Sequence, residues 1–135
     1  KSLNCQEKNI QMTCVADGKA LDFLNPMDIC SIFGNALDNA ITSAEKVENP
    51  EKRLIHVTVS QEKSFLRIKI ENSFQGEVRM KNQLPVTTKA DRRYHGFGVK
   101  SMKEVAEKYT GSLTVSVKDG WFELRILIPL PENKM

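Results

Sequence analysis

Two asparagines spaced four residues apart lie in the string FGNALDNA, residues 33–40. In a helix, Asn35 and Asn39 would project from one face, one turn apart. An amide oxygen is a neutral, hard ligand that Mg²⁺ accepts, and an amide NH₂ can donate to a phosphate oxygen. The pair could therefore hold a magnesium triphosphate, or simply form the hydrated face of the helix. Asn and Asp are poor helix formers, and the presence of three of them, including Asp38, favours a functional role.

Two glycines follow a basic stretch in the string RRYHGFGV, residues 92–99. Gly96 and Gly98 would let the backbone approach a ligand closely, and a helix that begins here would offer free N–H groups to an anion. The string is equally compatible with a tight loop-to-helix turn in which His95 is a structural residue. Three basic residues would supply positive charge at the same place: Lys89, Arg92 and Arg93.

Asn72 is the third polar candidate, and it follows the apolar segment 65–70. A polar side chain at the point where a buried strand opens into a loop can bind the edge of a purine. Asn is also a common turn residue at strand ends, so this position alone does not decide between the two interpretations.

Two amphipathic helices are predicted to carry these residues. The first runs from Pro26 to about Lys46, with Asn25 as its N-cap. The second covers about 98–109 and ends at Gly111, which is expected to be left-handed. Apolar residues recur at helical spacing on one stripe of each helix. The stripes contain Ile29, Cys30, Phe33, Ala36, Leu37, Ala40, Ile41 and Ala44 in the first helix, and Val99, Met102, Val105 and Ala106 in the second.

Strands are predicted where apolar and polar residues alternate: 10–15, 54–59, 65–70, 113–117 and 122–128. The second and third form a hairpin, as do the last two, which the Asp119-Gly120 dipeptide joins. Residues 72–95 form a charged loop, longer than compact domains usually contain without a function. The order predicts an α+β fold, a two-layer sandwich whose mixed, mostly antiparallel sheet carries helices on one face.

The composition indicates a single globular domain over residues 1–135, with residues 1–8 frayed. The net charge of +3 is too small and too evenly spread for a nucleic-acid-binding protein. No apolar run approaches the roughly 20 residues of a membrane span. Cys5, Cys14 and Cys30 lack CxxC spacing and indicate reduced thiols. The first residue is Lys rather than Met, which suggests a fragment of a longer protein.

The order of these features resembles the ATP-binding domain of sensor histidine kinases. This domain has the Bergerat fold and belongs to the superfamily that also includes DNA gyrase, Hsp90 and MutL. The resemblance covers residues 10–129. Residues 33–40 resemble the asparagine box of the family, and residues 95–99 resemble its second glycine box. Residues 87–89 (Thr-Thr-Lys), together with this glycine box, are most similar to the quorum-sensing, AgrC-like branch.

The resemblance implies roles for individual residues. Asn39 would coordinate Mg²⁺, and Asn35 would face the phosphates as a second candidate ligand. Residues 74–94 would form the ATP lid. Asn72 stands where the family normally has an Asp that accepts from adenine, and an amide accepts more weakly than a carboxylate, so weaker ATP binding is expected. The other residues expected at ATP are Lys89, Arg93, His95, Gly96, Phe97, Gly98 and Val99, with Arg92 also a candidate to neutralise charge.

Asn35 also bears on the type of reaction. ATP hydrolases of the superfamily carry a Glu here as general base for water, whereas an amide cannot accept a proton near neutral pH. The domain would instead present the γ-phosphate to another nucleophile, by positioning and charge neutralisation. In the kinases this nucleophile is a histidine on a separate dimerisation domain. Neither His56 nor His95 matches it, so no catalytic acceptor is expected within the chain.

The expected function is that of the catalytic domain of a two-component sensor histidine kinase that uses ATP and Mg²⁺. Its partners would be the dimerisation domain and a response regulator, with no nucleic acid and no direct membrane contact. The isolated domain would be a cytoplasmic monomer, inactive in autophosphorylation, from an integral membrane sensor. Two alternatives stay open: a degenerate module that docks a partner without turnover, which Asn72 favours, and an anti-sigma-type serine kinase.

Overall fold

A computed structural model describes residues 9–75, 80–81, 84–85 and 97–131. The elements, in chain order, are β1 (Gln11–Ala16), η1 (Gly18–Leu21), α2 (Pro26–Ala44), η2 (Pro50–Lys52), β2 (Leu54–Glu62), β3 (Phe65–Ser73), β4 (Met80–Lys81), β5 (Leu84–Pro85), α3 (Phe97–Lys108), β6 (Ser112–Lys118) and β7 (Trp121–Pro129). The pair β4 and β5 lies within the segment predicted as a loop, which corrects that prediction.

The main sheet has five strands in the order β1-β2-β3-β7-β6. Strand β1 is parallel to β2, and the remaining neighbours are antiparallel, which confirms the predicted mixed sheet. The turn between β6 and β7 has positive φ at Asp119 (53°) and Gly120 (78°). Two central residues with positive φ give the twist that a two-residue hairpin requires, so the dipeptide was a correct signal.

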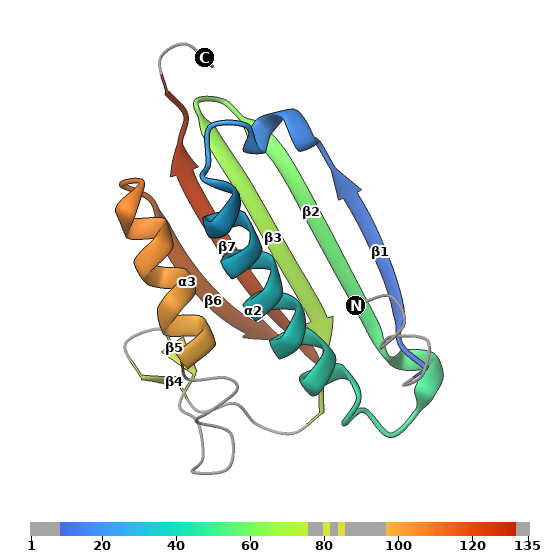
Figure 1. Cartoon of the computed structure of the whole chain (residues 1–135). Helices are drawn as coiled ribbons and strands as arrows, with labels where there is room; N and C mark the ends of the chain where they lie inside the picture. The colour runs from blue at the N-terminus through green and yellow to red at the C-terminus, as the bar shows by residue number, and fades with distance from the viewer. Residues whose placement is uncertain (1–8, 76–79, 82–83, 86–96, 132–135) are drawn as a thin grey trace.

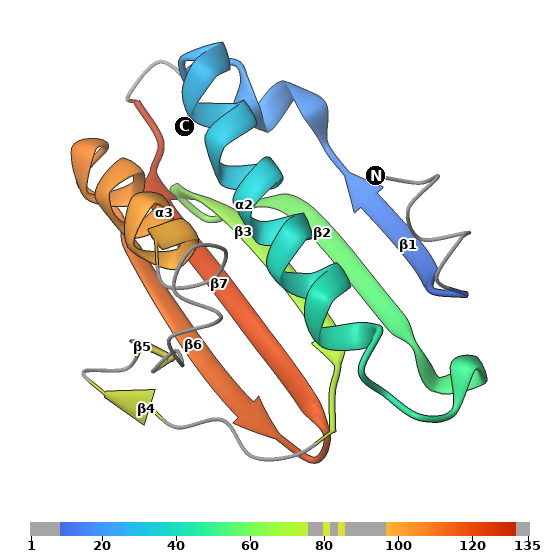
Figure 2. The same cartoon turned by 60° about the horizontal axis from the view of Figure 1, so that its bottom comes forward.

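Helices α2 and α3 lie side by side on one face of this sheet (Figures 1 and 2). Alternate strand residues point toward them and form the core, because successive side chains of a strand project to opposite faces. Three of these residues are completely buried in adjacent strands: Ile55 in β2, Ile68 in β3 and Ile126 in β7. The predicted two-layer α+β architecture is therefore confirmed.

Helix α2 begins as predicted, because the Asn25 side chain accepts a hydrogen bond of 2.8 Å from the Met27 N–H. Most of the predicted stripe is confirmed: Ala36, Ala40, Ile41 and Ala44 are buried, and Ile29, Phe33 and Leu37 pack against the core. Cys30 is exposed, whereas Ile32 and Asn39 are buried. The interface is therefore rotated toward the side of the helix that carries the amides.

The end of α3 corrects another prediction. Thr110, not Gly111, is left-handed, with φ of 66°. Gly111 is required for space instead, since a Cβ there would lie 2.3 Å from the Leu127 carbonyl oxygen. The sequence identifies the turn but cannot show which strand passes so close to it.

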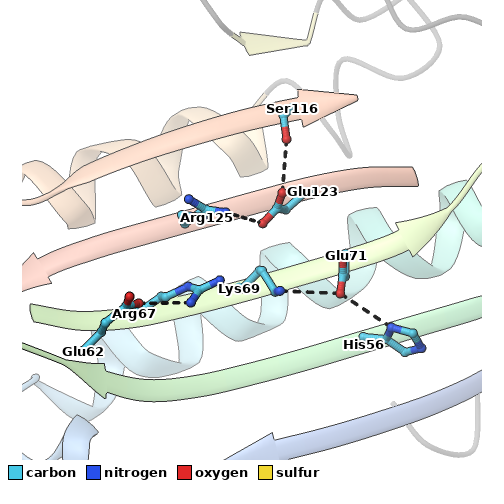
Figure 3. Close-up of polar contacts among 8 residues, drawn as sticks. All are labelled: His56, Glu62, Arg67, Lys69, Glu71, Ser116, Glu123 and Arg125. Atoms are coloured by element: carbon cyan, nitrogen blue, oxygen red, sulfur yellow. Dashed lines mark hydrogen bonds and ion pairs between the residues drawn. The ribbon is translucent and has the colours of Figure 1, made fainter. Parts of the chain in front are cut away.

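The second face of the main sheet carries polar side chains, as Figure 3 shows. Most of them form pairs. Arg67 donates to Glu62 at 3.0 Å, and Arg125 donates to Glu123 at 2.9 Å. None of the described helices is long and apolar enough to cross a membrane.

Candidate functional site

Asn39 is buried on α2 rather than hydrated, with only 8% of its surface exposed. Its Oδ1 has no hydrogen-bond partner among the residues that the structure describes. An unsatisfied buried acceptor costs about 1–3 kcal/mol. The neighbouring Asp38 is exposed, so the hydrated-face interpretation holds for that residue and fails for Asn39. Asn39 Oδ1 is therefore a buried acceptor on α2 that a ligand could satisfy.

Asn35 lies against the first turn of α3. Its Nδ2 donates to the Ser31 carbonyl oxygen at 2.8 Å, which fixes the orientation of the amide. A Cβ on Gly98 would lie 3.3 Å from Asn35 Oδ1, so the two helices are close here. Backbone N–H groups in the first turn of a helix have no partner within the helix and suit an anion. Asn35 and the start of α3 therefore meet at one place, with Asn39 one turn further along α2.

Asn72 lies on the helix-covered face of β3 and is 2% exposed. Its Nδ2 donates to the Ser73 carbonyl oxygen at 2.9 Å. An amide has one acceptor oxygen in addition to its NH₂ group. One N–H of this group is used on the backbone, which orients the amide, and Oδ1 is the atom of Asn72 that can accept from a ligand.

The predicted site residues are thus brought together in part. Asn35, Asn39 and Asn72 share the helix-covered side of the sheet, Gly98 contacts Asn35, and Val99 is a core residue that is 3% exposed. Phe97 begins α3. Five of the expected residues lie outside the described ones, as does most of the expected lid, 74–94: Lys89, Arg92, Arg93, His95 and Gly96.

His56 lies away from this site, on the second face of the sheet. Its Nδ1 is 3.6 Å from a Glu71 carboxylate oxygen, and its ring lies 5.2 Å from that of Trp121. A cavity of about 480 Å³ at the end of the sheet and one of about 300 Å³ on the second face are not lined by Asn35, Asn39 or Asn72.

Sequence reasoning missed a polar junction between the two helices. Asp28 Oδ2 accepts from Lys108 Nζ at 2.8 Å and from the Tyr109 hydroxyl. These hydrogen bonds, first that of Lys108, hold the pKa of the Asp28 carboxyl below its ordinary range. The partners are 80 and 81 residues apart in the chain, so no local spacing could have indicated the junction.

A magnesium ion fits the chemistry of the α2 amides. Asn39 Oδ1 is a hard, neutral oxygen that is buried and lacks a partner among the described residues. Within the same described ranges, no group of three His, Cys, Asp or Glu residues could hold a metal ion. A metal here would be held by an amide oxygen rather than by a cluster of carboxylates.

A family model identifies the family of this chain, and solved structures share its fold. The model of the GHKL domain matches residues 24–129. No curated protein matches the chain. Among solved structures, the catalytic domain of histidine kinase ThkA has a TM-score of 0.71 at 18% identity, over 99% of this chain and 88% of that one. Histidine kinase AdeS from Acinetobacter baumannii has a TM-score of 0.65 at 13% identity, over 97% and 59% of the two chains.

Full-length ShkA in complex with AMPPNP is a further structural neighbour. Its TM-score is 0.64 at 14% identity, over 95% of this chain and 27% of that chain. Identities this low show a shared fold alone.

Proposed function

The chain belongs to the GHKL domain family, and on that premise we propose that it is the ATP-binding catalytic domain of a sensor histidine kinase. It binds ATP with Mg²⁺ and transfers the γ-phosphoryl group to a histidine on a separate dimerisation domain. The quorum-sensing, AgrC-like branch is the proposed subfamily, on the strength of the Thr-Thr-Lys string and the second glycine box.

One observation carries the proposal. The buried Oδ1 of Asn39, which has no hydrogen-bond partner within the described ranges, lies on the same helix as Asn35, which contacts the start of α3 at Gly98. Acceptors for a cation and backbone donors for an anion are therefore adjacent, and a magnesium-bridged triphosphate needs both. The ShkA neighbour was solved with AMPPNP, an ATP analogue, which supports a nucleotide as the ligand.

The amide of Asn35 favours phosphoryl transfer over hydrolysis. A hydrolase needs a group that accepts a proton from water, and a neutral amide does not do so near neutral pH. The Nδ2 of Asn35 is also committed to the Ser31 carbonyl oxygen. The domain thus contributes position and charge neutralisation, which dominate phosphoryl transfer.

Magnesium would be held by Asn39 Oδ1, with Asn35 as second candidate ligand, and would neutralise charge on the phosphates. Asn72 Oδ1 would accept from the adenine amino group. Because this acceptor carries no charge, we expect weaker ATP binding than a carboxylate would give. The same feature favours a second candidate function, a degenerate module that docks a partner without turnover.

The remaining roles follow from the kinase proposal. The chain would act as one domain of a longer protein, with residues 74–94 as its lid, beside its own dimerisation domain and upstream of a response regulator. We propose a cytoplasmic location, as part of an integral membrane sensor, and a monomeric isolated domain.

Calorimetric titration with Mg-ATP tests the proposal. The wild-type domain should bind, and Asn39→Ala should weaken binding by roughly a hundredfold, through loss of a ligand to the bridging ion. Gln11→Ala, which removes an exposed amide on β1, is the matched control and should bind like wild type.

Absence of Mg-ATP binding by a folded wild-type domain would overturn the kinase proposal and leave the docking module. Equal affinity of wild type and Asn39→Ala would remove Asn39 from the site. Thermal unfolding of each variant without nucleotide shows whether the protein is folded in every titration.

A further inference from the structure

Helices α2 and α3 lie side by side (Figure 2) and contact each other at two places. At the candidate site, Asn35 contacts Gly98 in the first turn of α3. At the other end of α3, Lys108 and Tyr109 bind Asp28. The two helices are therefore antiparallel neighbours. Asp28 and Asn35 are seven residues apart, so they project from nearly the same side of α2, two turns apart.

The second junction is more extensive than an isolated surface ion pair. Asp28 Oδ2 accepts from both Lys108 and Tyr109, and the Asp28 side chain is only 15% exposed. The Tyr109 hydroxyl in turn accepts from the Asn25 N–H at 3.0 Å, and its ring forms a T-shaped contact with that of Phe23. The junction thus links the end of α3 to the N-cap of α2.

The two junctions lie at opposite ends of α3. A helix of 12 residues is a stiff rod of about 18 Å, so a change at one end alters the position of the other. At the site end, Gly98 and Asn35 are held by packing. At the other end, the Asp28 carboxylate binds the Lys108 ammonium group and the Tyr109 hydroxyl.

We propose that Asp28 is a positioning residue for the nucleotide site. By holding the C-terminal end of α3, it sets the position of the first turn of α3 relative to Asn35 and the phosphates. The inference rests on the proposed ATP-binding function. A positioning role differs from a simple contribution to stability. It predicts that loss of Asp28 weakens binding of the phosphate end of the ligand while the contact of Asn72 with the base is kept.

The test uses ¹H–¹⁵N NMR titrations of the domain, which also monitor folding and tolerate the millimolar ligand that weak binding requires. Asp28→Asn should weaken Mg-ATP binding by roughly tenfold, as displacement of a binding group by a fraction of an ångström can do. Adenosine affinity should change less than about twofold, since adenosine lacks the phosphates. Tyr109→Phe, which keeps the ring, should act in the same direction with a smaller effect.

Glu107→Gln is the matched control, since Glu107 is an acid on α3 whose ion pair, with Lys103 at 4.0 Å, stays within that helix. It should leave both affinities unchanged. Equal losses for Mg-ATP and adenosine, or no loss for Asp28→Asn and Tyr109→Phe, would overturn the inference. A wild-type domain that binds neither ligand would overturn the proposed function instead, so the two failures are distinguishable.

Discussion

The two faces of β3 differ in the polar side chains that they carry. On the helix-covered face, Asn72 follows Ile68 and Ile70 and is almost completely buried. On the other face, Lys69 lies 3.8 Å from Glu71, and Arg67 pairs with Glu62 (Figure 3). Polar groups on the covered face are few and uncharged, whereas those on the second face are charged and mostly paired with each other.

This difference between the two faces indicates on which face a ligand would bind. Two atoms on the second face, Arg67 Nε and Arg125 Nε, are buried without partners among the described residues, but each belongs to a guanidinium already paired through another nitrogen. Asn39 Oδ1 lies on the helix above the covered face. It is the acceptor atom of its side-chain amide, and it has no hydrogen-bond partner among the described residues. A buried acceptor in an apolar layer is costly unless something binds it.

The largest expected contrast between the two faces comes from adjacent residues of β3. Ile68→Ala should lower the free energy of unfolding by about 3 kcal/mol, because Ile68 is completely buried and the change leaves a cavity. Lys69→Ala should cost about 0.5 kcal/mol or less, since its ion pair is partly exposed. Urea denaturation measures both. Similar losses for the two variants would show that the second face also supports the core.

Much of the fold could be predicted because its signals are local. The N-cap Asn25, the turn at Asp119 and Gly120 and the alternation of the strands are all encoded within a few residues. The left-handed residue after α3 was placed one position late, at Gly111. The reason is that Leu127, distant in sequence, sets the space available there.

The candidate site could be predicted only in part. The spacing of Asn35 and Asn39 identified the helix face but could not show that Asn39 is buried, since burial depends on how α2 rotates over the sheet. Asp28 was missed because its partners come from the other end of the chain. Residues in contact across elements leave no periodic signal.

A smaller change in the free energy of unfolding, opposite in sign to that of Ile68→Ala, is expected at Asn39. Asn39→Leu should raise the free energy of unfolding of the nucleotide-free domain by about 1–2 kcal/mol, because it replaces a buried acceptor that no described residue satisfies with an apolar group of similar size. Glu71→Leu, on the second face, should change it by about 0.5 kcal/mol or less. Thermal and urea unfolding without nucleotide measure both. A clear loss of stability in Asn39→Leu would mean that the amide is satisfied and needs no ligand.

The smallest effect concerns the charge pairs of the second face at low pH. Burial tends to raise the pKa of Glu123, but the hydrogen bond and charge of Arg125, with Ser116 and Lys69, outweigh it and leave the pKa below the ordinary value of 4.5. Glu123 therefore contributes stability that is fully present above pH 4.5 and is lost as the pH falls through its lower folded-state pKa. Glu123→Gln should make the unfolding free energy fall less steeply below pH 4.5, in urea titrations between pH 6 and pH 3. An unchanged slope of unfolding free energy against pH would show that ionised carboxylates of this face are stabilised equally in the folded and the unfolded chain. The second face would then be merely hydrated.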